Sequence, residues 1–129
     1  AAGFDRARLI AQSPGVARLV FGTIDFQCDL GIGGDDDELL FFRSRLVLDS
    51  RLAGIDAPVD GVCAAIDDPQ RLQQESRRAR RLGFGAKLCI HPRQVDIVNR
   101  AFRSREISAS ARIKSAYPFR SIIRPTASK

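Results

Sequence analysis

The chain has 129 residues, of which 44% are hydrophobic and 28% are charged. This size and composition are typical of one globular domain and exclude a disordered chain, a collagen-like chain and a disulfide-rich miniprotein. No apolar run approaches the roughly 18–20 residues that a membrane-spanning helix needs, so we expect no membrane partner.

The net charge of +6 is concentrated in the C-terminal segment. Residues 1–102 carry 14 basic and 14 acidic residues, whereas residues 103–129 carry seven basic residues and one acid. A basic domain surface is typical of nucleic-acid-binding proteins, but here the excess belongs to the tail. The single tyrosine and the absence of tryptophan also leave no aromatic platform for stacking bases. We therefore do not expect nucleic acid as the main partner.

The cysteines and the start of the chain indicate the compartment and the origin of the sequence. Cys28, Cys63 and Cys89 are an odd number, lie far apart and sit in apolar stretches. This pattern favours reduced, buried thiols in a cytoplasmic protein over disulfides or zinc ligands. The first ten residues lack the apolar core of a signal peptide. The chain contains no methionine and starts in mid-pattern, so we expect it to be a fragment.

Short apolar runs, of the kind that form buried parallel strands, alternate with helical segments. The predicted strands are residues 17–22, 59–66 and 86–90, and the predicted helices are residues 4–10, 39–52, 70–82 and 92–102. Strands and helices that alternate with short connections predict βα units on a parallel sheet. We assign residues 1–102 to this domain and expect residues 103–129 to form a divergent, weakly packed basic tail.

Each predicted strand ends beside a residue that can do chemistry. Asp25 follows the first strand, Asp67 follows the second and His91 follows the third. In α/β barrels, catalytic residues lie at the C-terminal ends of strands. Because parallel strands place these ends at one edge, the sequence predicts that Asp25, Asp67 and His91 lie on the same rim.

Asp25 is the best single candidate for a functional residue. Magnesium takes oxygen ligands, usually one or two carboxylates together with water and substrate oxygens. Gly22, three residues earlier, would let a substrate approach the backbone. The structural alternative is that Asp25 only caps a turn before Phe26. Asp29 is a candidate for a neighbouring ligand, but it is expected to face solvent.

The other polar groups have simpler explanations beside the functional ones. Asp68 precedes a proline and a predicted helix, so its expected role is that of an N-cap. Asp67 is left open between contact with a ligand and exposure to solvent. For His91, the favoured interpretation is a hydrogen-bonded residue at the start of a helix. A role in lining a ligand pocket comes second, and a role as general base comes third. The arginine cluster at 77–81 can hold phosphates, but a solvated helix face is the expected arrangement.

Two segments carry a family resemblance: ARLVFGTIDFQCDLGI and APVDGVCAAIDDPQRLQQESRRARRLGFGAKLCIHPRQVDIVNRAF. They closely resemble the HpcH/HpaI aldolase and citrate lyase beta-subunit-like family, the CoA-ester lyases built on a (β/α)₈ barrel. The motifs FG-x-x-DF and GF-G-x-K-x-C-IHP-x-Q are specific at this separation, and the match covers most of residues 1–102. The resemblance implies an α/β fold, with about three βα units of a partial TIM barrel that correspond to strands six to eight.

The same resemblance implies a chemistry. Family members use Mg²⁺ to cleave or form a carbon–carbon bond between an acyl-CoA and a keto acid or carboxylate, and their metal-binding aspartate matches Asp25. The glutamate that shares the metal would lie just upstream of the first residue. His91 and Pro92 match a turn near the bound CoA, and Gly22 and Asp67 are weaker candidates for substrate contact. No catalytic residue is assigned.

Three functions remain open from the sequence. The chain can represent the C-terminal barrel portion of a CoA-ester lyase that is inactive alone. It can instead be a non-catalytic remnant or interaction module, or a binder of nucleic acid or acidic surfaces through its tail. Because three parallel strands leave sheet edges unpaired, we also expect a homo-oligomer.

Overall fold

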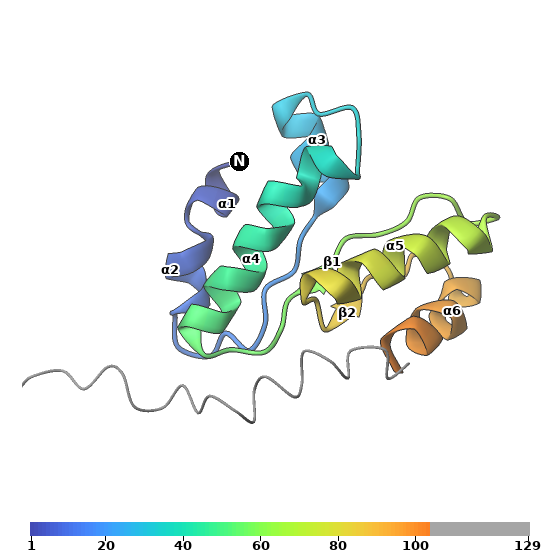
Figure 1. Ribbon diagram of the computed structural model, residues 1–129. Coiled ribbons are helices and arrows are strands. Elements are labelled where there is room, and N and C mark those ends of the chain that lie inside the picture. The colour runs from blue at the N-terminus through green and yellow to red at the C-terminus, as the bar shows by residue number, and fades with distance from the viewer. Residues whose placement is uncertain (104–129) are drawn as a thin grey trace, which may run out of the picture.

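The computed structural model describes residues 1–103, and the expectation of an irregular basic tail lies outside this range (Figure 1). The helices are α1 (Ala2–Asp5), α2 (Ala7–Ala11), α3 (Thr23–Leu30), the 3₁₀ helix η1 (Asp37–Leu39), α4 (Leu40–Ala53), α5 (Pro69–Leu82) and α6 (Pro92–Arg103). The strands are β1 (Val59–Asp60) and β2 (Ala86–Lys87). None of the helices within residues 1–103 is long and apolar enough to span a bilayer.

The sheet is parallel, as predicted. β1 pairs with β2, and Val20 forms an isolated parallel bridge to Val59 on the other side of β1. The backbone N–H of Phe21 donates to the carbonyl of Val59 at 3.0 Å, and the N–H of Gly85 donates to the carbonyl of Pro58 at 2.9 Å. The three predicted strands therefore lie side by side in chain order.

The strands are much shorter than the predicted ranges 59–66 and 86–90. The side chain of Gln94 replaces strand pairing beyond β1 and β2: its amide donates to the carbonyl of Cys63 and its oxygen accepts from the N–H of Ile90, both at 2.9 Å. Because a buried side chain satisfies these backbone groups, the chain needs no continuous ladder there. The apolar runs are only partly buried, since Ile66, Leu88 and Ile90 are 39%, 37% and 52% exposed. Their length also overestimated the strands.

Helix α3 was not predicted, because residues 23–25 were interpreted as a strand end and a turn. The helix starts after Gly22 and ends at Gly31, whose φ of 67° gives a left-handed C-cap. Only Thr23 and Phe26 on it are buried, so it lacks the long apolar period that identifies a helix in a sequence. The ring of Phe26 packs 4.7 Å from that of Phe42, centroid to centroid.

The start of α5 confirms the predicted N-cap. The carboxylate of Asp68 accepts a hydrogen bond from the N–H of Arg71 at 2.9 Å, and Pro69 occupies the first turn. Gly54 and Gly83 end α4 and α5 with φ angles of 73° and 104°, a conformation that favours glycine. The predicted start of α5 and the predicted ends of α4 and α5 therefore each lie within one residue of the observed boundary.

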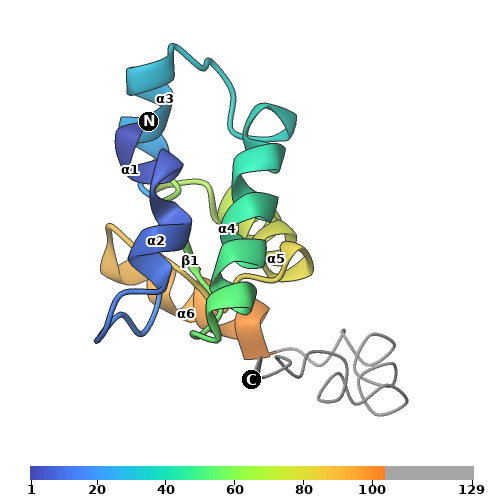
Figure 2. The same cartoon turned by 90° about the vertical axis from the view of Figure 1, so that its left-hand side faces the viewer.

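The apolar core has two parts. One lies among α1, α2, α3, α4 and the strand around Val20, and contains Phe21, Leu39 and Leu46. Helices α1 and α2 lie beside α4 in both views (Figures 1 and 2). The other lies between β1, α5 and α6, and contains Leu72 and Val98. These two clusters hold the helices against the sheet.

Some apolar residues are less buried than the sequence indicates. Leu40 and Leu52, which lie in the predicted helix 39–52, are 41% and 58% exposed. Arg43 and Asp49 are buried on that helix instead, because ion pairs replace apolar contacts there. Of the three free cysteines, only Cys63 is buried, Cys89 is half-buried and Cys28 is exposed.

Candidate functional site

Asp25 stands in the first turn of α3, directly after the strand residues that pair with β1. Its side chain is exposed, and together with Asp29 it lines a cavity of about 680 Å³. A Cβ atom placed on Gly22 would lie 3.7 Å from the nearer carboxylate oxygen of Asp25. A free carboxylate at the N-terminus of a helix is well placed to bind a hard cation whose other ligands come from water or substrate.

A tight contact to the middle strand fixes the start of α3. Thr23 is 2% exposed, and a Cβ atom on Gly61 would lie 2.1 Å from its hydroxyl oxygen. Only glycine at position 61 therefore lets the helix approach the carboxyl end of β1 so closely. Thr23 and Phe26 anchor one side of α3, which leaves Asp25 on the open side.

Asp67 and His91 lie on the loops after β1 and β2, and Arg93 connects them. Its guanidinium lies 3.3 Å from the carboxylate of Asp67, and its backbone N–H donates to Nδ1 of His91 at 3.2 Å. Pro92 begins α6. All three predicted rim residues thus follow carboxyl ends of parallel strands. The structure joins Asp67 to His91 through Arg93, whereas Asp25 lines a cavity that neither of them lines.

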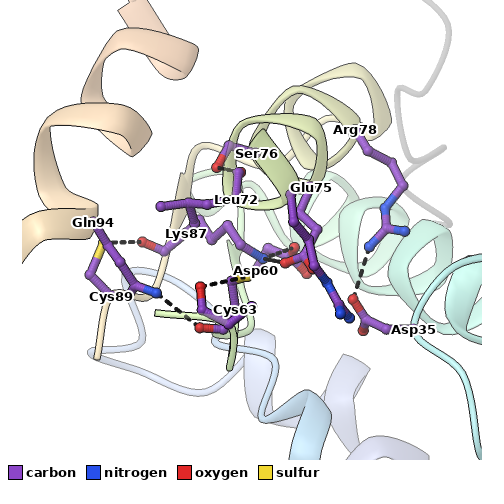
Figure 3. A network of polar contacts seen from close by, with 12 residues as sticks. Asp35, Asp60, Cys63, Leu72, Glu75, Ser76, Arg78, Lys87, Cys89 and Gln94 are labelled. Atoms are coloured by element: carbon purple, nitrogen blue, oxygen red, sulfur yellow. Dashed lines mark hydrogen bonds and ion pairs between the residues drawn. The ribbon is translucent and has the colours of Figure 1, made fainter. Parts of the chain in front are cut away.

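A buried charged network that was not predicted from the sequence lies between the sheet and helices α4 and α5 (Figure 3). Asp60 of β1 is fully buried and accepts from Nε of Arg43 at 2.8 Å and from Nζ of Lys87 at 3.1 Å. Lys87 also lies 3.3 Å from the carboxylate of Glu75. One carboxylate on the central strand therefore holds two buried cations, one from α4 and one from β2.

The same network extends to the loop before α4. Arg43 donates to the carbonyl and the carboxylate of Asp35, at 2.6 and 2.8 Å, and Arg78 of α5 contacts Asp35 and Asp36. Burial alone lowers the pKa of Arg43, but the charges and hydrogen bonds of Asp60 and Asp35 outweigh it and raise that pKa. Arg43 therefore stays charged in the interior.

One sequence signal pointed to this network. Arg43 lies four residues after Leu39 and three residues before Leu46, on the inward face of the predicted helix, where a charged side chain needs a buried partner. The prediction that the arginine cluster at 77–81 lies on a solvated helix face was wrong for two of its members. Arg78 and Arg80 are half-buried, and Arg80 donates to the carbonyl of Ala101 at 2.9 Å.

Asp25 fits Mg²⁺ as one ligand of an incomplete coordination shell. Within residues 1–103, no group of three or more histidine, cysteine, aspartate or glutamate side chains is close enough to hold a metal ion. Magnesium commonly keeps several waters and takes only one or two protein carboxylates. Asp25 can therefore supply one ligand, and the rest of the coordination shell must come from elsewhere.

Comparison with known proteins identifies the family. The family model for HpcH/HpaI aldolase/citrate lyase matches residues 1–92. This match covers most of the chain, including the segment that carries Asp25. The chain belongs to this family. The fold is accordingly α/β and forms part of a TIM-like barrel.

Individual relatives agree with this assignment. A citrate lyase subunit beta-like protein of Deinococcus radiodurans is 40% identical over 78% of this chain and 36% of its own length. The mitochondrial citramalyl-CoA lyase of Rattus norvegicus is 33% identical over 65% of this chain and 25% of its own. The citrate lyase beta subunit of Mycobacterium tuberculosis was solved with oxaloacetate and magnesium. Its match to this chain has a TM-score of 0.71 at 31% identity, and covers 81% of this chain and 49% of that subunit. The chain thus spans between a quarter and a half of these relatives.

Proposed function

We propose that this chain forms the Asp25-bearing part of a Mg²⁺-dependent CoA-ester lyase that cleaves or forms a carbon–carbon bond between an acyl-CoA and a keto acid or carboxylate. The observation that supports this most is the exposed carboxylate of Asp25, which follows a parallel strand in a chain of this family. A solved relative at 31% identity carries magnesium and oxaloacetate, and another relative is named for a CoA ester.

Each candidate residue has a role in this proposal. Asp25 holds the metal, which stabilises the charge that develops on a substrate carbonyl during carbon–carbon cleavage. Gly22 keeps the backbone beside Asp25 open to substrate. The loops that carry Asp67, His91 and Pro92 contact the CoA moiety, and an exposed ion pair joins Asp67 to Arg93.

The described residues do not complete this site. Within residues 1–103, no group of three or more histidine, cysteine, aspartate or glutamate side chains includes Asp25, so the described residues offer no complete set of metal ligands. We therefore propose that the chain alone binds Mg²⁺ weakly and is not a competent lyase. The open sheet edge favours association with a further polypeptide, which includes a homo-oligomer.

Paramagnetic Mn²⁺ used in place of Mg²⁺ tests the metal site in the isolated chain. Weak binding at Asp25 would broaden the backbone amide signals around the first turn of α3 in a two-dimensional NMR spectrum. Asp25→Asn should abolish this local broadening, whereas Asp96→Asn on α6 should not change it. Equal broadening in the wild type and in Asp25→Asn would refute the assignment of Asp25.

A further inference from the structure

Five arginines lie on the second halves of α5 and α6, and we call them the arginine surface: Arg77, Arg80, Arg81, Arg100 and Arg103. Arg80 is half-buried and the other four are exposed. Elsewhere in the described part of the chain, six arginines pair with carboxylates: Arg18, Arg43, Arg45, Arg71, Arg78 and Arg93. Within residues 1–103, none of the five arginines of the surface does so. The sequence contains no acid between Glu75 and Asp96, so the second half of α5 has none to offer.

The fold brings the arginines of the two helices together. Helices α5 and α6 pack against each other and run in the same direction (Figure 1). The guanidinium of Arg80 on α5 donates to the carbonyl of Ala101 at 2.9 Å, between Arg100 and Arg103 on α6. Arg77 and Arg81 lie one turn apart on α5, which is about 6 Å along the helix axis. Because both helices begin at the carboxyl ends of strands, the arginine surface lies at the opposite end from the candidate site.

Helix dipoles account for only a small part of this charge. The C-terminus of a helix carries about half a negative charge, so the ends of α5 and α6 together offset about one arginine. Asp96 lies one turn before Arg100 and offsets at most one more, although Nε of Arg100 lies 3.3 Å from its backbone carbonyl and not from its carboxylate. An excess of about three positive charges therefore remains at the arginine surface. A surface of this kind favours a ligand that carries several negative charges.

The lack of apolar groups beside the arginines decides among such ligands. Within residues 1–103, the exposed large hydrophobic side chains lie outside α5 and outside residues 96–103. A protein partner normally needs an apolar or aromatic centre in the interface, and a membrane-surface helix needs an apolar face that enters the lipid. Single-stranded nucleic acid is bound on aromatic side chains. The backbone of a duplex needs only cations, and it presents one negative charge per about 1.7 Å of its axis.

We propose that the arginine surface binds the phosphate backbone of double-stranded nucleic acid without reading its base sequence. Guanidinium groups donate in pairs to phosphate oxygens, and Arg80 holds the last turn of α6 beside α5, so that both helices contact one stretch of backbone. The balanced charge of residues 1–102 predicted no nucleic acid as the main partner, because a sum does not show how charges are distributed over a surface. The interaction needs neither metal nor CoA, so it stands apart from the proposed lyase function.

Fluorescence anisotropy with the full chain and a labelled DNA duplex of about 20 base pairs tests the proposal, at salt concentrations from about 50 to 200 mM. The binding constant should fall linearly with salt on logarithmic scales. Each phosphate contact contributes about 0.9 to the slope, so the double variant Arg77→Gln with Arg81→Gln should reduce the slope by about 1.8. At about 0.1 M salt, this loss should weaken binding by about tenfold or more. Two duplexes of unrelated sequence should bind equally well.

The matched control is the double variant Arg6→Gln with Arg8→Gln, which loses the same charge at two exposed arginines outside the arginine surface. Both double variants keep residues 104–129, so a difference between them reports on α5 and α6. An equal change of slope in the two variants would overturn the proposal, as would an unchanged slope in Arg77→Gln with Arg81→Gln. Displacement of the labelled duplex more readily by poly-glutamate, or by a single strand of the same length, than by unlabelled duplex would also overturn it.

Discussion

Replacement of the buried carboxylate Asp60 by asparagine should strongly destabilise the chain. Asp60 is fully buried and is shared by Arg43 at 2.8 Å and Lys87 at 3.1 Å, both of which are themselves buried. An asparagine of the same size keeps the shape but leaves two cations facing a neutral amide. Loss of one partner of a buried ion pair costs about 3–5 kcal/mol, which is a large part of the roughly 5–15 kcal/mol that a domain of this size has.

Urea unfolding followed by circular dichroism measures this effect. With a slope of about 1.5 kcal/mol per molar, a loss of 3 kcal/mol lowers the midpoint by about 2 M. Asp56→Asn is the matched control, because Asp56 is 70% exposed and contacts Arg18 at 3.4 Å. An exposed pair of this kind contributes no more than about 1 kcal/mol.

A double variant tests the same reasoning from the opposite direction. In Asp60→Leu with Lys87→Met, Arg43 keeps its contacts to Asp35 and Glu75 keeps Arg71 at 3.0 Å. No buried charge loses its last partner, so this variant should be more stable than Asp60→Asn alone. A cost below about 1 kcal/mol for Asp60→Asn, or a double variant that is less stable than it, would refute this account of the network.

Two further predictions follow from burial. Gly61→Ala should destabilise the chain by about 1–3 kcal/mol, because the added methyl group collides with Thr23. The control is Gly33→Ala, whose added methyl group meets no atom within 4 Å and should leave the urea midpoint nearly unchanged. Burial raises the pKa of the Cys63 thiol. The stability that the buried, neutral thiol contributes is therefore present below the ordinary thiol pKa of about 8.5, and it declines as pH rises through the higher pKa of the folded state. Iodoacetamide should accordingly modify exposed Cys28 before Cys63 in a mass-spectrometric time course, and equal rates would contradict this.

The parallel arrangement could be predicted from the sequence because apolar runs and helix-boundary residues are local signals. Asp68 with Pro69, and Gly54 and Gly83 after helices, each act within a few residues. The partners of Asp60 could not be predicted in this way, because Arg43 and Lys87 are 17 and 27 residues away along the chain. Such pairs form only when the helices and strands pack together.

The candidate site, like the fold, could be predicted from the sequence only in part. Asp25 could be chosen as a metal ligand from its place after an apolar run and from the family motif, and it remains a proposal. Its setting could not be predicted, because Thr23 at the start of α3 packs closely on Gly61, which lies 38 residues away along the chain. The link between Asp67 and His91 through Arg93 likewise depends on the packing of two separate loops.

A keto-acid-release assay tests the proposed function most directly. The purified chain is incubated with citramalyl-CoA, malyl-CoA or citryl-CoA and with Mg²⁺, and the pyruvate, glyoxylate or oxaloacetate that carbon–carbon cleavage forms together with acetyl-CoA is measured against Asp25→Ala as control. Because residues 1–103 offer Asp25 without a cluster of further metal ligands, we expect no keto acid above background from either protein. Turnover by the wild-type chain that disappears in Asp25→Ala would show a complete active site and contradict the proposal that the chain alone is inactive.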